Sequence, residues 1–134
     1  MIVVTGGAGF LGRHLSRRLH REGNKVLVVD NHLTSDPRHS QDLAREGIRF
    51  LRHDVVDPLP IIETQAVYHL ASPASPKDYD RMPVETLRTG AEGTRNALEL
   101  ARRADATFLL ASTSEVYGEP QVHPQPETYH GNVS

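Results

Sequence analysis

The sequence predicts an α/β fold with a doubly wound parallel sheet, and two observations support this. Short runs of branched apolar residues alternate with stretches of helical periodicity, which is the spacing of β-α-β units. These runs are apolar throughout, without the alternation of a half-exposed strand, so helices are expected on both faces of the sheet. The expected strands are residues 2–5, 25–30, 48–51, 66–70 and 107–111.

Two helices are predicted from the spacing of apolar residues. The first has Leu11, Leu15 and Leu19 on one face, and Gly23 follows it where a left-handed residue ends a helix. The second is expected over 83–103, with Gly90 and Gly93 allowing a close approach of a helix or ligand. Its apolar stripe is expected to face the core and consists of Val84, Leu87, Ala91, Thr94, Leu98 and Ala101.

Composition argues for one domain and against several classes of function. The 134 residues carry 15 basic and 17 acidic side chains, a balance that disfavours nucleic acid or an anionic membrane as a partner. There is no cysteine, and the eight histidines lack the spacing of a zinc site, so no metal is expected. No signal peptide pattern is present at the N-terminus, and a cytoplasmic protein is expected.

A glycine-rich turn joins the first strand to the first helix. Gly6, Gly9 and Gly12 permit a tight turn and a close approach to pyrophosphate, as in Rossmann-type dinucleotide sites with strand order 3-2-1-4-5. Asp30 ends the second strand, where its carboxylate could accept both ribose hydroxyls, which favours NAD over NADP. The alternative is a helix cap that binds nothing.

A basic stripe runs along the first helix. Arg13, Arg17 and Arg21 follow one another at intervals of four residues. Such a stripe could hold the 2′-phosphate of NADP, or it could be a solvated face. With Asp30 in place, the solvated face is the favoured interpretation.

Longer motifs carry a resemblance to a known family. The glycine spacing G-x-x-G-x-x-G is that of the extended short-chain dehydrogenase/reductases, which include epimerases and dehydratases. Within that family the chain most resembles the UDP-glucuronate decarboxylases over residues 53–55, 69–76, 112–118 and 123–129. The resemblance implies NAD as cofactor and UDP-glucuronate as substrate. It also implies a lyase reaction in which C4 is oxidised, carbon dioxide is lost, and re-reduction yields UDP-xylose with NAD recycled.

The resemblance also assigns roles to residues. It implies that Gly9, Phe10 and Leu11 touch the pyrophosphate, that Asp30 and Asn31 hold the adenosine ribose, and that Asp54 and Val55 bracket the adenine. Leu70, Ala71, Ser72 and Thr89 would line the cofactor, and the candidate catalytic residues are Thr113, Ser114 and Glu115. Judged without the family, Asp54 could be a loop cap, Ser72 a turn residue and Glu115 an exposed carboxylate.

The chain also departs from the family. It contains no Tyr-x-x-x-Lys pair, because neither Lys25 nor Lys77 follows a tyrosine at that spacing, and Gly90 stands where the family usually has asparagine. We therefore expect residues 1–111 to form an NAD-binding core and residues 112–134 an active-site loop and tail. The expected chain is a truncated portion that lacks the C-terminal substrate region and is inactive alone. The expected partners are a second copy of the chain, through a homodimer formed by helix 83–103, or a companion chain that supplies the missing C-terminal half.

Two further interpretations remain open. One is a fragment of a dTDP-glucose 4,6-dehydratase or of a nucleotide-sugar epimerase, although Ser114 stands where the dehydratases have an acid. The other is a nucleotide-binding module without catalytic activity, or an inactive remnant.

Overall fold

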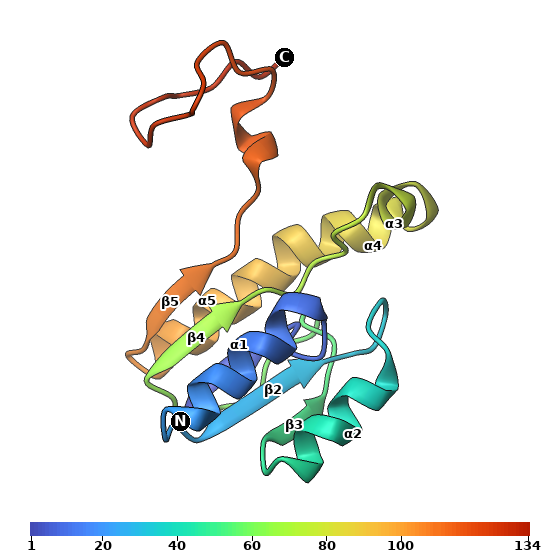
Figure 1. Cartoon of the computed structure of the whole chain (residues 1–134), viewed down its shortest axis with the longest axis vertical. Coiled ribbons are helices and arrows are strands. Elements are labelled where there is room, and N and C mark those ends of the chain that lie inside the picture. Colours follow the sequence, from blue (N-terminus) through green and yellow to red (C-terminus); the bar gives the residue numbers. More distant parts are fainter.

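The computed structural model describes all residues, 1–134, and contains one parallel sheet with the strand order β3-β2-β1-β4-β5 (Figure 1). Val3 in the central strand is in register with Leu27 on one side and Val67 on the other. The fold class and the strand order are thus confirmed, and strand limits differ from expectation by a residue at some ends. The strands are β1 (Ile2–Thr5), β2 (Val26–Asp30), β3 (Arg49–Arg52), β4 (Ala66–His69) and β5 (Thr107–Leu110).

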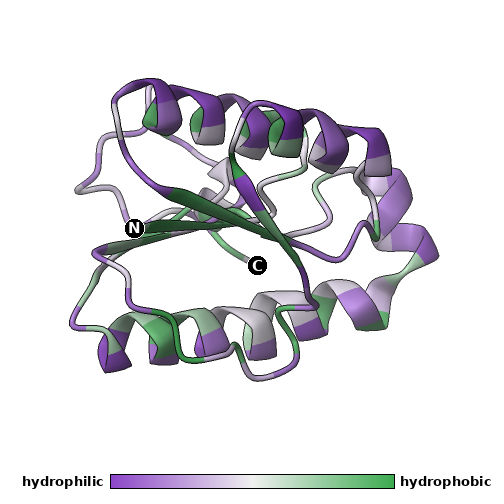
Figure 2. Ribbon diagram, turned by 90° about the horizontal axis from the view of Figure 1, so that it is seen from below, coloured by the Kyte–Doolittle hydropathy of each residue, from purple (hydrophilic) through white to green (hydrophobic).

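Helices cover both faces of the sheet (Figure 2). Helices α1 (Phe10–Arg21) and α2 (Pro37–Arg45) pack on one face, and α5 (Thr94–Arg103) packs on the other. A π-helical turn, η1 (Thr89–Gly93), joins α5 to α4 (Pro83–Arg88), and α3 (Pro76–Arg81) precedes α4. No helix of the chain combines the length and apolar character needed to cross a bilayer.

Helix α2 was not predicted, although its start is encoded locally. The Asp36 side chain accepts a hydrogen bond from Arg38 N, and Pro37 occupies the first helical position. Both features are typical of a helix N-terminus. The helix contributes only one large apolar residue to the core, Leu43, which is too few for an apolar stripe to be visible in the sequence.

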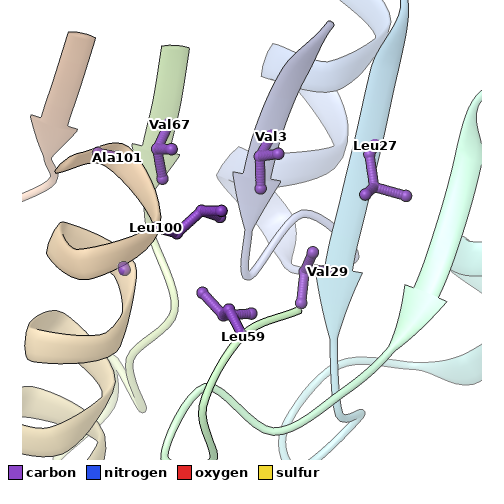
Figure 3. Close-up of a cluster of buried hydrophobic side chains, with 8 residues drawn as sticks. Val3, Leu27, Val29, Leu59, Val67, Leu100 and Ala101 are labelled. Carbon is purple, nitrogen blue, oxygen red and sulfur yellow. The ribbon is translucent and has the colours of Figure 1, made fainter. Parts of the chain in front are cut away.

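The core consists of one apolar cluster on each face of the sheet. On the α5 side, Leu59 from the loop between β3 and β4 closes the cluster that Figure 3 shows. On the other side, Leu19 of α1 and Leu43 of α2 cover the second cluster. The first cluster comprises Val3, Leu27, Val29, Leu59, Val67, Ala97, Leu100 and Ala101, and the second comprises Ile2, Val4, Leu19, Val26, Val28, Leu43 and Ile48.

The predicted core stripe of the 83–103 helix is wrong over most of its length. Val84 and Leu87 are 61% and 74% exposed, and Leu98 is also exposed, whereas Ala97 and Leu100 are buried. Helix α4 packs only against α3 and η1, so no sheet lies beneath it. The π-helical turn also changes the helical register, because its wider turn adds a residue.

The ends of the first helix were predicted better than its buried face. Gly23 has a φ of +87°, as expected for the residue that follows a helix C-terminus. Leu19 is buried, but Leu11 is 66% exposed. Leu11 lies in the first turn of α1, at the end of the sheet, where nothing in the chain covers it.

Residues beyond Ala111 leave the sheet (Figure 1). They include a short 3₁₀ helix, η2 (Ser114–Tyr117), and their own contacts, with Tyr117 stacked on Tyr129 at 5.9 Å between ring centroids. Strand β5 therefore forms an open edge of the sheet, with Leu109 and Leu110 about half exposed.

Candidate functional site

The turn between β1 and α1 requires glycine at two positions. Gly6 has a φ of +66°, and a Cβ built on it would lie 2.7 Å from Ala71 N. A Cβ on Gly12 would overlap Gly6 O. The missing side chains therefore allow α1, the turn and the chain after β4 to approach one another closely.

The N-terminus of α1 presents free backbone amides. Gly9 caps the helix and supplies no side chain, and the amides of Phe10, Leu11 and Gly12 donate to no group of the chain. Phe10 is 70% exposed, so this helix end is open to solvent. Free amides and the partial positive charge of a helix N-terminus together favour an anion.

Asp30 is attached directly to this turn. The residue is only 8% exposed, and its Oδ2 accepts from Ala8 N at 3.0 Å. Its Oδ1 accepts from His32 N at 2.8 Å and from Ser35 Oγ at 2.9 Å. A carboxylate has about four acceptor positions, so one position on Oδ2 remains for a ligand.

Asn31 and Asp54 meet beside Asp30. Asn31 Nδ2 donates to Asp54 Oδ2 at 2.9 Å, across the ends of β2 and β3. Asp54 Oδ1 also accepts from Val56 N, so Asp54 caps its loop as well as contacting Asn31. The adjacent Val55 is buried, and its carbonyl accepts from Asn96 Nδ2 of α5 at 2.9 Å.

The segment after β4 lies against the glycine turn. Leu70 and Ala71 are the residues that a Cβ on Gly6 would strike. Ser72 Oγ donates to Pro73 O at 3.1 Å, which is the local turn contact that the sequence left open. Thr89 is buried, and its hydroxyl donates to Glu85 O at 2.8 Å. Both hydroxyls are therefore engaged within the chain.

The candidate catalytic residues lie apart from this cluster. Thr113, Ser114 and Glu115 are exposed, and Thr113 Oγ1 accepts from Glu115 N to cap η2. No strand or helix of the sheet packs against η2. The structure thus brings the predicted cofactor residues together at the carboxyl ends of the strands, but it does not bring these three residues to them.

The basic stripe on α1 is not a solvated face at its first two positions. Arg13 Nη1 lies 2.7 Å from His39 Nε2, and Arg17 forms two-pronged contacts with Glu46, the shortest 2.6 Å. Both partners come from α2 or its C-terminal end. His39 was not predicted as a site residue from the sequence. Its position beside the turn depends on α2, and α2 was not predicted either.

His69 is a second residue that sequence reasoning missed. It ends β4, with its Nδ1 2.7 Å from Thr5 Oγ1 and its Nε2 3.3 Å from Thr94 Oγ1. The residue is 2% exposed, and this burial lowers the pKa of the imidazole from 6.5 to about 4. The ring is therefore neutral at physiological pH and joins β1, β4 and α5.

Gly93 and Gly90 differ in their surroundings. A Cβ on Gly93 would lie 2.8 Å from Val55 Cγ2, so this glycine permits the close packing that the sequence predicted. A Cβ on Gly90 would meet no atom within 4 Å. Nothing in the structure explains glycine at position 90.

Comparison with known proteins agrees with this geometry. The chain is 52% identical over 134 residues to UDP-glucuronic acid decarboxylase 1 of Xenopus tropicalis, and 48% identical over 135 residues to UDP-glucuronic acid decarboxylase 3 of Arabidopsis thaliana. These alignments cover 99% of the chain but only 32% and 39% of the two relatives. The chain thus spans about a third of the length of the curated relatives it matches.

Solved structures of epimerases share the fold. The UDP-glucose 4-epimerase of Thermus thermophilus, solved in complex with NAD, superimposes with a TM-score of 0.80 at 30% identity, over 98% of this chain and 44% of that one. A UDP-galactose 4-epimerase gives a TM-score of 0.84 at 31% identity, again over 98% and 44%. The family model described as NAD dependent epimerase/dehydratase matches residues 2–133, in agreement with both sets of similarities. This match over nearly the whole length agrees with the glycine turn, its free amides and the acid at the end of β2. The chain belongs to the NAD dependent epimerase/dehydratase family.

Proposed function

We propose that this chain binds NAD across the glycine turn, as the cofactor-binding part of an enzyme that resembles the UDP-glucuronate decarboxylases. The observation that carries the proposal is the hydrogen bond from Ala8 N to Asp30 Oδ2, which fixes an acid beside the free amides of α1. The relatives named UDP-glucuronic acid decarboxylase support the choice of enzyme.

The residues of the turn suit an adenosine diphosphate group. The amides of Phe10, Leu11 and Gly12 would hold the pyrophosphate, and the absence of side chains at Gly6 and Gly12 keeps the turn tight. Leu70, Ala71, Ser72 and Thr89 would line the cofactor from the β4 side. Asn31 would assist Asp30 at the ribose, and Asp54 and Val55 would lie beside the adenine.

Asp30 can accept one ribose hydroxyl without rearrangement. A second hydroxyl would displace the Ser35 hydroxyl from Asp30 Oδ1. Ser35 Oγ also lies 3.0 Å from His32 Nδ1, which can accept the same proton. The Ser35 hydroxyl can therefore give up its bond to Asp30 and donate to His32 instead.

Calorimetric titration tests the cofactor site. We expect the chain to bind NAD⁺ and to bind NADP⁺ at least about tenfold more weakly, because a 2′-phosphate would meet the carboxylate of Asp30. Asp30→Asn should weaken NAD⁺ binding and reduce the difference in affinity between NAD⁺ and NADP⁺. Asp105→Asn, at the opposite end of the sheet, is the matched control. A folded chain that gives no heat with NAD⁺ would contradict the proposal.

We propose a nucleotide sugar, UDP-glucuronate, as the substrate of the whole enzyme. Bound NAD supplies a reversible hydride acceptor for the sugar C4 hydroxyl. Thr113 would hydrogen-bond that hydroxyl, and Ser114 and Glu115 would position the sugar or move a proton. Residues 1–111 would form the cofactor core, and 112–134 the loop that carries these three side chains.

The 134 residues alone are proposed to be inactive. Their two lysines, Lys25 and Lys77, form no Tyr-x-x-x-Lys pair, and a tyrosine with an ordinary pKa near 10 is a poor base at neutral pH. Release of carbon dioxide from UDP-glucuronate and NAD⁺ is the decisive assay. Release by the isolated chain would contradict the inactivity, and NAD⁺ binding without release would agree with a binding module.

A further inference from the structure

We propose that His39 is a positioning residue that holds the backbone of the phosphate-binding turn in the form that receives the dinucleotide. The inference rests on the proposed NAD site. It concerns a residue of α2 that would not itself touch the cofactor and that acts through Ala8. The relevant contacts are those of His39 with Ala8 O and with Arg13.

Ala8 is fixed at both ends of its backbone by side chains from elsewhere in the chain. Its amide donates to Asp30 Oδ2 at 3.0 Å, and its carbonyl accepts from His39 Nδ1 at 2.9 Å. The residue is completely buried. Ala8 lies between Gly6 and Gly12, so these two bonds fix the backbone within the turn that is proposed to receive the anion.

The partners of His39 determine its protonation. Ala8 O can only accept, so Nδ1 must carry the proton. The guanidinium of Arg13 can only donate, so Nε2 must be unprotonated. His39 is therefore the neutral Nδ1–H tautomer. Protonation of Nε2 would remove the Arg13 contact.

The carbonyl that His39 contacts stands opposite a free amide of α1 in the helical hydrogen-bond pattern. Ala8 O is the carbonyl four residues before Gly12, the position from which an α-helix would accept the Gly12 amide. Here Ala8 O accepts from His39 Nδ1 and not from Gly12 N, so α1 begins at Phe10 with the Gly12 amide unpartnered. That amide is one of the three proposed to receive the pyrophosphate.

A second path ties α2 to the same site. His32 Nε2 lies 3.2 Å from Ser40 Oγ in the first turn of α2, and His32 N donates to Asp30 Oδ1. Helix α2 is thus connected to the carbonyl of Ala8 through His39 and to Asp30 through His32. A shift of α2 would therefore strain or break both connections.

Arg13 supports His39 from α1. It is half-buried, its Nε is buried without a partner, and its guanidinium lies 5.7 Å from the centre of the Phe10 ring. Its one hydrogen bond to another side chain is that to His39 Nε2, at 2.7 Å. Arg13 therefore orients the imidazole so that Nδ1 faces Ala8.

Two conservative variants separate the contacts of His39. In His39→Asn the amide nitrogen takes the place of Nδ1 and can still donate to Ala8 O, whereas in His39→Gln the side-chain oxygen reaches the place of Nε2 and the Nδ1 donor is lost. We expect His39→Asn to bind NAD⁺ within about twofold of the unmodified chain. His39→Gln and His39→Phe should bind NAD⁺ about tenfold more weakly, because each loses one buried hydrogen bond. Thermal unfolding of each variant shows whether it is folded. Loss of affinity in His39→Asn equal to that in His39→Phe would overturn the proposal, and so would full affinity in His39→Gln.

Nitrogen-15 NMR of the His39 ring in the ligand-free chain tests the arrangement without NAD⁺. A protonated Nδ1 and an unprotonated Nε2 are expected, and the reverse tautomer would overturn the proposal. Failure of the unmodified chain to bind NAD⁺ would contradict the proposed function. The NMR measurement would still show whether His39 Nδ1 donates to Ala8 O, independently of NAD⁺ binding.

Discussion

The imidazole of His69 lies between two threonine hydroxyls, with Nδ1 2.7 Å from Thr5 Oγ1 on the neighbouring strand. Thr94 Oγ1 of α5 lies 3.3 Å from the other ring nitrogen. Phe108 of β5 stacks on the ring at 6.1 Å between centroids. No carboxylate takes part in these contacts, so the site holds a neutral ring and offers no partner for a charged one.

Acid should therefore destabilise the chain through His69. Its folded-state pKa of about 4 lies below the ordinary value of 6.5, so the unfolded chain binds the proton more readily. The contribution to stability is complete above pH 6.5 and is lost as the pH falls toward 4. The loss amounts to about 3 kcal/mol by linkage. Chemical denaturation from pH 7.5 to 4 measures it.

A matched pair of variants isolates this effect. His69→Gln retains polar atoms for the threonines but does not titrate, so its unfolding free energy should change less over the same pH range. The exposed His130 provides the control, because His130→Gln should leave the pH dependence unchanged. Equal pH dependence in His69→Gln and the unmodified chain would show that other groups are responsible.

The glycines of the turn should not tolerate alanine. Gly6→Ala would force an L-residue to a φ of +66° and bring its Cβ to 2.7 Å from Ala71 N, and Gly12→Ala would overlap Gly6 O. We expect each to lower the free energy of unfolding by about 1–3 kcal/mol and to abolish measurable NAD⁺ binding. Gly90→Ala is the control. It should raise stability by up to about 1 kcal/mol, because a helical alanine loses less backbone entropy than glycine.

Gly93 and Val55 should be energetically coupled. The Cβ of Gly93→Ala would lie 2.8 Å from Val55 Cγ2, so the single variant should be destabilised by about 1–3 kcal/mol. Val55→Ala removes the methyl group in question. A double-mutant cycle should therefore show the Gly93→Ala penalty reduced in the Val55→Ala background. If the two changes in unfolding free energy simply add, the backbone around Gly93 moves away from Val55 instead of meeting its methyl group.

Much of the fold could be predicted from the sequence because its strands are buried on both faces. Val3, Val28 and Val67 are completely inaccessible, and continuous apolar runs of this kind are typical of a covered parallel sheet. Helix periodicity was less reliable. The exposed Val84 and Leu87 repeat at the same spacing as a core stripe, and spacing alone does not reveal whether a sheet lies beneath a helix.

The site was predictable only in part. The glycine turn and Asp30 are close in sequence to elements with clear patterns, and the structure joins them by one hydrogen bond. The contact of His39 with Ala8 spans 31 positions and depends on α2, whose single buried leucine leaves no periodic signal. Long-range polar contacts of this kind are determined by tertiary packing, and residue spacing does not encode them.

The exposed apolar residues of α4 and α5 should mediate self-association. Val84, Leu87 and Leu98 lie on the helical segment 83–103 and are uncovered, and β5 forms an open edge of the same sheet. Exposed apolar surface of this kind favours association. Sedimentation at micromolar concentration should show dimers or larger species, and Leu87→Glu should shift the population toward monomer. Val133→Glu is the control, because Val133 is 68% exposed but lies in the tail that leaves the sheet after β5. A folded monomer at these concentrations would contradict an interface on this helix, and an effect of Val133→Glu alone would place the interface on the C-terminal tail.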